Sequence, residues 1–265
     1  MSLLTEPFSN AYLNRGLVRK LASAETHKKT AGSILGRLWL VVSPVLFMLV
    51  YTFTYAVVLR LRPSELTFEA YMVHLFAGLL PFLAISESLT GSVVAIRQNQ
   101  SFLNNASFPT EALPLKVVVM SLFGLFWGLL ILVMGTIVFI GPQLKMLLLF
   151  AVVPLHFLFM SGLAFLLSVL GALLKDAQNL IGYIAMIVML ASPIAYTENM
   201  IPESLRFYIY VNPFSFMIQS YQSCLVPGYF SETALGVFAA LAIILFVLGF
   251  WLFMRVKKVI TIYAQ

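Results

Sequence analysis

The chain has 265 residues, of which 61% are hydrophobic and only 10% charged, and its mean hydropathy is +0.98. Because soluble domains carry about 25% charged residues, this composition excludes an ordinary soluble protein and favours a polytopic membrane protein. The net charge of +6 follows the predicted membrane topology, so no nucleic-acid partner is expected. With Cys224 as the single cysteine, the chain can form neither an internal disulfide nor a cysteine-based metal site, and we expect no metal.

Residues 12–29 are predicted to form an amphipathic interface helix. Leu13, Leu17, Leu21 and Ala24 share one helical face, and the basic residues lie largely elsewhere. Such a helix can lie in the plane of the lipid headgroups, where basic side chains attract anionic lipid. A solvated basic helix is the alternative.

Six apolar segments are predicted to be transmembrane helices of an all-α protein. The first of them carries no charged side chain and, at ~1.5 Å per residue, is long enough to cross a hydrocarbon core of ~30 Å. The second is interrupted by Gly78 and Pro81. The six predicted spans are residues 38–59, 71–96, 115–140, 146–174, 180–196 and 233–254.

Residues 198–232 are aromatic and apolar, but prolines divide them. The uninterrupted pieces, Glu203–Val211 and Pro213–Val226, have 9 and 14 residues, which is too few to span a bilayer. We predict short external re-entrant or interfacial helices, which are tolerated at membrane depth only when packed against protein.

The basic residues indicate the orientation of the spans. With six spans and a cytoplasmic N-terminus, 12 of the 16 Lys and Arg residues fall on the cytoplasmic side, as the positive-inside rule requires. Both termini are therefore predicted to be cytoplasmic, with residues 97–114 as a long cytoplasmic loop.

Nothing in the sequence predicts an enzyme. The histidines His27, His74 and His156 lie in three different segments without a metalloprotease motif, and no G-x-x-x-x-G-K-[ST] phosphate loop is present. We expect ATP and Mg²⁺ to be bound by a separate partner subunit that docks on loop 97–114. An inert connector is the alternative for this loop.

Glu87 is the one ionisable residue expected well inside a span. A charge at mid-membrane costs about 2.5–3.5 kcal/mol on insertion scales, so this carboxyl is either protonated or placed in a wet cavity. Structural and functional roles both stay open for it.

Five ordered segments resemble a known family. In this order they are similar to type-2 ABC transporter permeases of the polysaccharide-export branch, which move O-antigen, capsule or teichoic acid chains. The segments are GSILGRLW (Gly32–Trp39), the run from AGLLPF (Ala77–Phe82) to FPTEALPL (Phe108–Leu115), KDAQNL (Lys175–Leu180), SPIAY (Ser192–Tyr196) and IPESLRFYIYVNPF (Ile201–Phe214).

The resemblance implies a homodimer of six-span subunits in the bacterial cytoplasmic (inner) membrane, with two ATP-binding cassette subunits beneath it. It also implies a coupling helix in loop 97–114 and, as substrate, a glycan on a polyprenyl diphosphate lipid. Two departures concern the cytoplasmic contacts, because this chain has Lys29-Thr30-Ala31 and Asn104-Asn105 where family members often have basic residues. The residues expected to contact the ATPase subunit are Asn99, Phe102, Asn104, Asn105, Phe108, Pro109, Lys175 and Asp176.

An aromatic stripe in the first span is a candidate channel lining. Ser43, Phe47, Tyr51 and Tyr55 recur at every fourth position, with Thr54 adjacent. Aromatic faces stack weakly and repeatedly on sugars, which suits a passage that must not retain its cargo. Ordinary core packing is the alternative.

Two further groups are candidate sites at the membrane boundaries. Arg37 and Arg97 on the inner side, and Arg60 and Arg62 on the outer side, could bind the lipid diphosphate, or they could be simple topology anchors. Aromatic residues in the external segment could form a gate or an interfacial belt. They are Phe207, Tyr208, Tyr210, Phe214 and Phe216.

These observations favour the channel-forming permease of an ATP-driven polysaccharide exporter. A type-2 permease for a drug or small lipid is the nearest alternative, and a non-transporting membrane scaffold is an alternative of a different class. An integral-membrane transferase is disfavoured, because the chain lacks clustered acids or histidines.

Overall fold

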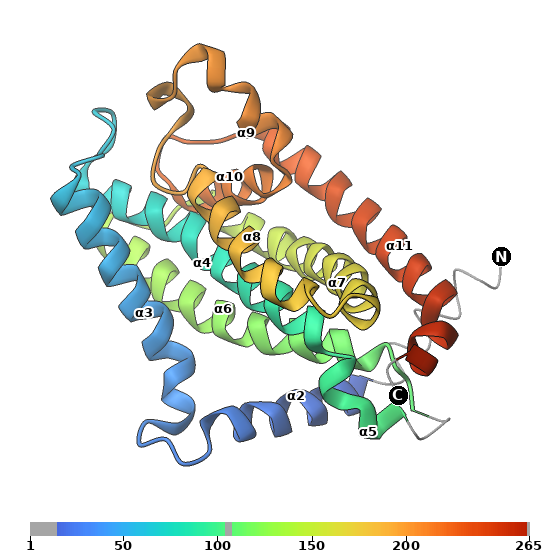
Figure 1. Ribbon diagram of the computed structural model, residues 1–265. Coiled ribbons are helices and arrows are strands. Elements are labelled where there is room, and N and C mark those ends of the chain that lie inside the picture. Colours follow the sequence, from blue (N-terminus) through green and yellow to red (C-terminus); the bar gives the residue numbers. More distant parts are fainter. Residues whose placement is uncertain (1–14, 104–107, 264–265) are drawn as a thin grey trace.

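The computed structural model describes residues 15–103 and 108–263, and in these residues the chain forms helices and loops without a strand, as predicted (Figure 1). The α-helices are α2 (Arg15–Thr30), α3 (Trp39–Thr52), α4 (Phe68–Val94), α5 (Gln100–Leu103), α6 (Ala112–Phe139), α7 (Leu149–Leu173), α8 (Ala177–Ala191), α9 (Phe207–Val211), α10 (Pro213–Leu225) and α11 (Glu232–Tyr263). A π-helical segment, η2 (Phe53–Val58), continues α3.

Helix α4 is the centre of the bundle, and it packs against α6, α7, α8 and α10. Its N-terminus is capped by Thr67, whose hydroxyl accepts a hydrogen bond from the Ala70 amide at 3.3 Å. The interruption expected at Gly78 and Pro81 is not observed, because α4 runs without a break through both residues. Surrounding helices enclose this stretch, and such packing lets a helix tolerate an internal proline. At Gly78, an added Cβ would lie 3.0 Å from the side chain of Ile218, so the glycine allows α10 to approach closely.

The most extensive contact between two helices is that of α7 with α11. Gly162 in α7 and Gly249 in α11 face each other: a Cβ at Gly162 would lie 2.5 Å from the Leu245 carbonyl, and one at Gly249 would lie 2.3 Å from the Gly162 carbonyl. Small residues at such a crossing allow two backbones to touch, which is how van der Waals packing holds helices together in lipid.

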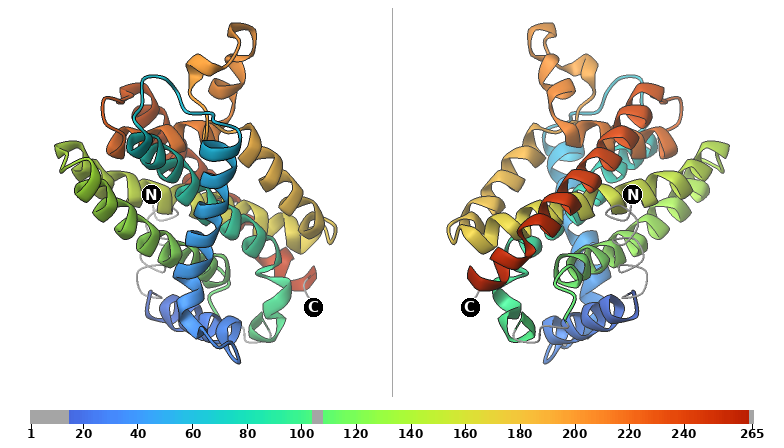
Figure 2. Two further views of the ribbon diagram at one scale, coloured as in Figure 1. Left: turned by 90° about the vertical axis from the view of Figure 1, so that its left-hand side faces the viewer. Right: turned by 90° about the vertical axis from the view of Figure 1, so that its right-hand side faces the viewer.

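Helix α2 lies across one end of the bundle, near α5, while α9 lies at the opposite end (Figures 1 and 2). The side chains of α2 that pack most closely are Val18 and Ala22, which are buried against α6, rather than the predicted face. Leu17 and Leu21 are half-buried and Ala24 is exposed, so the contacting face is rotated from the expected one. Leu13 lies outside the described residues.

The turn from α2 to α3 depends on glycine. Gly32 and Gly36 have φ values of +76° and +50°, a left-handed conformation that residues with a Cβ rarely adopt. This turn redirects the chain from the end of the bundle into α3, and the indole of Trp39 closes it by donating to the Ser33 hydroxyl at 2.7 Å.

In the described part of the chain, five helical stretches are long and apolar enough to cross a membrane. They are Val41–Val58, Phe68–Val94, Ala112–Phe139, Leu144–Leu173 and Glu232–Lys257. They correspond to five of the six predicted spans. Helix α11 continues beyond the predicted end at residue 254, and in this extension Lys257 pairs with Glu111 at 2.6 Å.

The remaining predicted span, 180–196, is helical only as far as Ala191. Helix α8 has 15 residues, about 22 Å at 1.5 Å per residue, which is shorter than the ~30 Å hydrocarbon core. Ser192-Pro193 end the helix, and the chain continues as a non-helical segment to Thr197. The side chains of α8 that pack inward are Ala177, Ile181 and Ala185.

The segment 198–232 folds into short pieces with breaks near the predicted prolines. A 3₁₀ turn, η6 (Glu203–Leu205), precedes α9, and α10 follows after Asn212. The Asn212 side chain accepts from the Phe214 amide at 3.0 Å, and Pro213 occupies the first helical position, where its missing N–H is not needed. Most side chains of α10 are buried, so this short helix is packed against protein.

Candidate functional site

The aromatic stripe of α3 forms a continuous row of rings. The ring centroids of Phe47 and Tyr51 are 6.0 Å apart, and those of Tyr51 and Tyr55 are 4.5 Å apart. Tyr51 is only 8% exposed and belongs to the main hydrophobic core, whereas Phe47 is 39% exposed. The middle of the stripe therefore packs as core, while its Phe47 end is accessible.

Tyr55 and the adjacent Thr54 lie in η2, where the backbone widens. The Thr54 carbonyl accepts from the Leu59 amide and the Tyr55 carbonyl accepts from the Leu61 amide, each at 2.9 Å. Single π-helical turns of this kind are frequent at functional sites.

A cavity of about 520 Å³ lies between α3, α4 and α6. Ser43 and Phe47 line it from α3, and Glu87 and Ser121 line it from α4 and α6. The structure thus brings two members of the stripe to the same cavity as the intramembrane acid. Glu87 is exposed at this wall rather than buried in the bundle.

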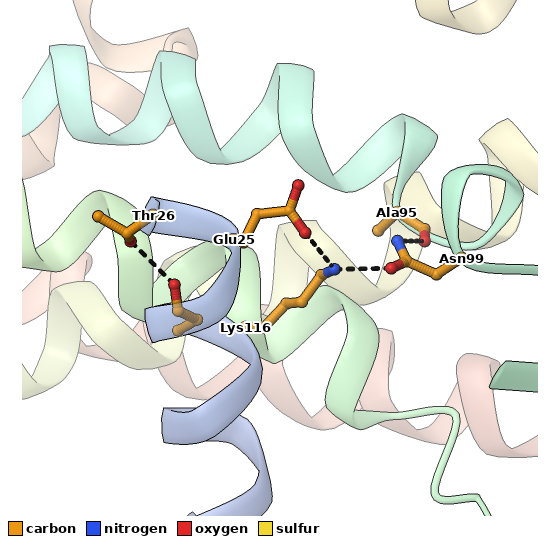
Figure 3. A network of polar contacts seen from close by, with 6 residues as sticks. Glu25, Thr26, Ala95, Asn99 and Lys116 are labelled. Atoms are coloured by element: carbon orange, nitrogen blue, oxygen red, sulfur yellow. Dashed lines mark hydrogen bonds and ion pairs between the residues drawn. The ribbon is translucent and has the colours of Figure 1, made fainter. Parts of the chain in front are cut away.

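The end of the bundle near α2 contains a buried ion pair (Figure 3). The Lys116 ammonium donates to a carboxylate oxygen of Glu25 and to the side-chain oxygen of Asn99, each at 2.8 Å. The Lys116 side chain is 4% exposed and that of Glu25 is 30% exposed. The Asn99 amide nitrogen in turn donates to the Ala95 carbonyl at 2.7 Å. These contacts join α2 to α6 and to the start of the loop predicted to dock the ATPase.

The same loop carries a stacked aromatic pair with one exposed and one half-buried ring. The rings of Phe102 and Phe108 are stacked with centroids 5.1 Å apart, and Phe102 is exposed. The Pro109 carbonyl accepts from the Ala112 amide and so begins α6. Asn104 and Asn105, which are predicted to take part in the same contact, lie outside the described residues.

Lys175 and Asp176 lie on the exposed turn between α7 and α8. Arg97 connects this turn to the loop after α4, because its guanidinium donates to the Ala172 carbonyl at 3.1 Å, near the end of α7. Six of the eight predicted contact residues therefore lie at one end of the bundle, and the other two are the undescribed Asn104 and Asn105.

The four predicted arginines are not equivalent. Arg97 is half-buried and bonded to backbone, which suits an anchoring role. Arg60, with φ of +50°, and Arg62 are exposed in the loop after η2, at the other end of α3. The side chain of Arg37 lies outside the described part of the chain.

The predicted gate residues divide into two sets. Phe207 and Tyr210 are exposed, and Tyr208 is half-buried. By contrast, Phe214 packs edge-on against Phe82 and Phe159, and Phe216 is buried. These last two rings hold α10 in the bundle.

Polar contacts arrange the exposed set. The Tyr208 hydroxyl donates to the Tyr196 hydroxyl, and the Tyr210 hydroxyl donates to a Glu198 oxygen, each at 2.6 Å. The bond to Glu198 favours the neutral phenol and raises the pKa of Tyr210. The Tyr196 hydroxyl also donates to the Ala191 carbonyl at 2.7 Å, which ties this cluster to the end of α8.

Sequence reasoning missed the polar contacts that hold α10. His156 Nδ1 lies 2.9 Å from the Tyr221 hydroxyl, and Gln222 Nε2 lies 3.3 Å from His74 Nε2. All four side chains are buried. The signal available in the sequence was the presence of two histidines, and of the adjacent Tyr221 and Gln222, within apolar stretches. Which of these side chains pair depends on the tertiary fold.

No group of three or more His, Cys, Asp and Glu side chains that could hold a metal ion occurs in the described residues. The single cysteine, Cys224, is buried and unpaired within α10.

Residues 17–226 match the model of a family described as ABC-2 type transporter. The chain belongs to this family. It is 31% identical over 215 residues to the O-antigen export system permease protein RfbA of Myxococcus xanthus, covering 80% of this chain and 81% of the relative. It is 28% identical over 229 residues to the protein of the same name from Klebsiella pneumoniae, covering 85% and 86%. Identity to the polysialic acid transport protein KpsM of Escherichia coli is 22% over 202 residues, covering 75% and 76%.

Family membership and the long apolar helices agree on the class of protein. The chain is a multi-pass protein of the cytoplasmic membrane, and the relatives named as permeases match it over most of their own length. This ABC-2 member therefore carries the transmembrane part of a transporter.

The ion pair of Lys116 predicts an asymmetric mutational effect. Glu25→Ala leaves a buried ammonium with one neutral partner, and breaking a buried pair in this way costs about 3 kcal/mol or more. Lys116→Met removes the buried charge itself, and the partly exposed Glu25 can turn to water, so a smaller cost of about 1–2 kcal/mol is expected. Thermal unfolding of the detergent-solubilised protein should show Glu25→Ala as the less stable variant. Lys20→Met, at an exposed position of α2, is the control, and the reverse order would contradict this account.

Proposed function

We propose that the chain is the channel-forming permease subunit of an ATP-driven ABC exporter that moves lipid-linked polysaccharide across the cytoplasmic membrane. The observation that carries this proposal is the similarity, over four-fifths of the chain, to permeases whose names specify O-antigen export. The similarity to a polysialic acid transport protein supports polysaccharide rather than one glycan type.

The proposed orientation places α2 and α5 on the cytoplasmic side and α9 on the outside. In this arrangement α8 is the fifth of six spans, and the non-helical segment after Ala191 completes its passage. Helices α9 and α10 then form a re-entrant segment at the outer side. The positive-inside rule supports this orientation, because α2 and the end of α11 are rich in Lys and Arg.

We propose that conformational changes of an ATP-hydrolysing partner are transmitted to this chain at its cytoplasmic end. The exposed ring of Phe102, which stacks on the half-buried Phe108, is the kind of anchor that dominates protein interfaces. The exposed turn at Lys175 and Asp176 lies at the same end. We infer that two ATP-binding cassette subunits, which hold ATP and Mg²⁺, dock there on a homodimer of this chain.

The passage itself is proposed to run along α3 at the dimer interface. The side chains of Ser43 and Phe47 are accessible, and Tyr55 is half-buried above the packed Tyr51. In this proposal the stripe leads toward Tyr196 and Tyr208, and Tyr208, with the exposed Phe207 and Tyr210, would act as the outer gate. Arg60 and Arg62 lie exposed where the lipid diphosphate would leave, whereas Arg97 is committed to the Ala172 carbonyl.

Substrate-dependent ATP turnover tests the proposed function. The chain, copurified with the proposed ATP-binding cassette partner, is reconstituted in liposomes with a polyprenyl-diphosphate-linked glycan. We expect ATP hydrolysis to rise severalfold with the glycan lipid, and not with the same polyprenyl diphosphate without sugars. An ATP hydrolysis rate that does not change when the glycan lipid is added would indicate a scaffold. A rate that rises only with a small lipid or drug would indicate a different cargo.

The channel assignment predicts a face-dependent loss of export. The double variant Phe47→Ala, Tyr55→Ala removes one exposed and one half-buried ring of the stripe but leaves the buried Tyr51, so the dimer should still assemble while export falls about tenfold. Phe53→Ala, which removes an exposed ring from the same helical region outside the stripe, is the matched control. Surface glycan is measured in cells with equal permease levels. Normal export from the double variant would contradict the assignment.

A further inference from the structure

A second cavity, of about 340 Å³, lies at the end of the bundle that we propose faces outward. Its walls come from the loop before α4, the segment after α8, helix α10 and the turn between α10 and α11. None of the residues predicted for the channel stripe or the gate lines it. Its volume is within the range of about 300–1,000 Å³ that is typical of small-molecule sites.

The lining combines apolar residues with several polar and aromatic side chains. Side-chain amides come from Asn199, Gln219 and Gln222, and phenol rings come from Tyr196 and Tyr229. The other polar groups are two carboxylates, Glu65 and Glu198, the Thr197 hydroxyl and the His74 imidazole. Among the described residues no lysine or arginine lines the cavity.

One basic residue lies behind the wall. Lys145 donates to the Val226 and Tyr229 carbonyls, so its ammonium holds the α10–α11 turn. Burial, followed by the charge of Glu198, raises the pKa of Tyr229 to about 12, and its phenol therefore stays neutral.

Several of the polar groups are held in place before any ligand arrives. The Gln222 side chain, in a residue only 1% exposed, donates to the Pro193 carbonyl at 3.2 Å and lies against His74. The Tyr196 hydroxyl donates to the Ala191 carbonyl at 2.7 Å, which fixes its ring. The hydroxyl of Thr197 is buried without a hydrogen-bond partner in the described part of the structure, and such a group calls for a polar partner. Groups fixed in this way lose little entropy on binding.

We propose that this cavity binds an uncharged sugar residue of the exported glycan as it emerges on the outer face. Sugar hydroxyls both donate and accept hydrogen bonds. Side-chain amides can donate to them and accept from them, and carboxylates can accept from them. The phenol rings offer apolar faces for the C–H surfaces of a sugar ring. Two carboxylates without a lysine or arginine in the described lining repel an acidic sugar or a phosphate. The proposal rests on the proposed export function, and it adds that the outer site discriminates by charge.

Sugar binding to the purified permease in nanodiscs tests this proposal without transport. Saturation-transfer difference NMR is recorded in EDTA with methyl α-mannopyranoside and methyl β-galactopyranoside as neutral probes and N-acetylneuraminic acid as the acidic probe. We expect transfer to at least one neutral probe and little to the acidic one. Gln219→Leu should weaken the binding of the neutral probe about threefold to tenfold, because one or two hydrogen bonds are lost. Gln178→Leu, at an exposed position of α8 outside the cavity, should leave binding unchanged.

Charge provides the second comparison. Glu65→Gln removes one lining carboxylate and should increase transfer to N-acetylneuraminic acid, whereas Glu69→Gln, at an exposed position of α4 that does not line the cavity, should not. The proposal would be overturned if the wild type and Gln219→Leu bound the neutral probes equally well. It would also be overturned if the wild type bound the acidic probe as strongly as the neutral ones. Because this readout needs neither ATP nor a partner, it can fail while glycan-stimulated ATP turnover persists, which separates it from the export function.

Discussion

The structure depends on the need to satisfy every backbone polar group without water. A short helix inside a bilayer leaves unsatisfied amides and carbonyls at its ends, and each costs several kcal/mol in hydrocarbon. Helix α10 has only 13 residues, so at the membrane depth that we propose for it, it would be stable only inside the bundle. The Asn212 cap, the packing of Phe214 and Phe216, and contacts from His74 and His156 provide that enclosure.

The enclosure of α10 also determines where the polar surfaces can lie. The middle of α4 is surrounded by apolar neighbours, so polar groups gather at its two ends. At one end, Lys116 joins α2 to the loop after α4, where we propose that the partner docks. At the other end, the segments beside α10 leave a polar cavity and a tyrosine cluster. In the proposed orientation, the bundle lies between the cytoplasmic contact and the outer surface.

The sequence predicted the helices well because hydrophobic length and proline breaks are local signals. It could not predict that α4 passes unbroken through Pro81, since that depends on the surrounding helices. By contrast, the helix end near Ser192-Pro193 is a local signal, and α8 ends at Ala191, directly before it. At the site, periodicity found the stripe, and the structure joins Phe47 to the cavity that contains Glu87. Periodicity could not separate the buried Phe214 and Phe216 from the exposed Phe207 and Tyr210. Lys116, within an otherwise apolar stretch, was a signal of a buried partner, but only the fold identifies Glu25.

The central claim is that the α5 end and the α9 end of the bundle face opposite sides of the membrane. The buried single cysteine allows a direct measurement in a Cys224→Ser background. Ser101→Cys in α5 and Ser204→Cys in η6 place one exposed thiol at each end, and a membrane-impermeant maleimide reports which is accessible in spheroplasts. The account predicts labelling of Ser204→Cys in intact spheroplasts and of Ser101→Cys only after permeabilisation. Labelling of both from the same side, or in the reverse order, would contradict it.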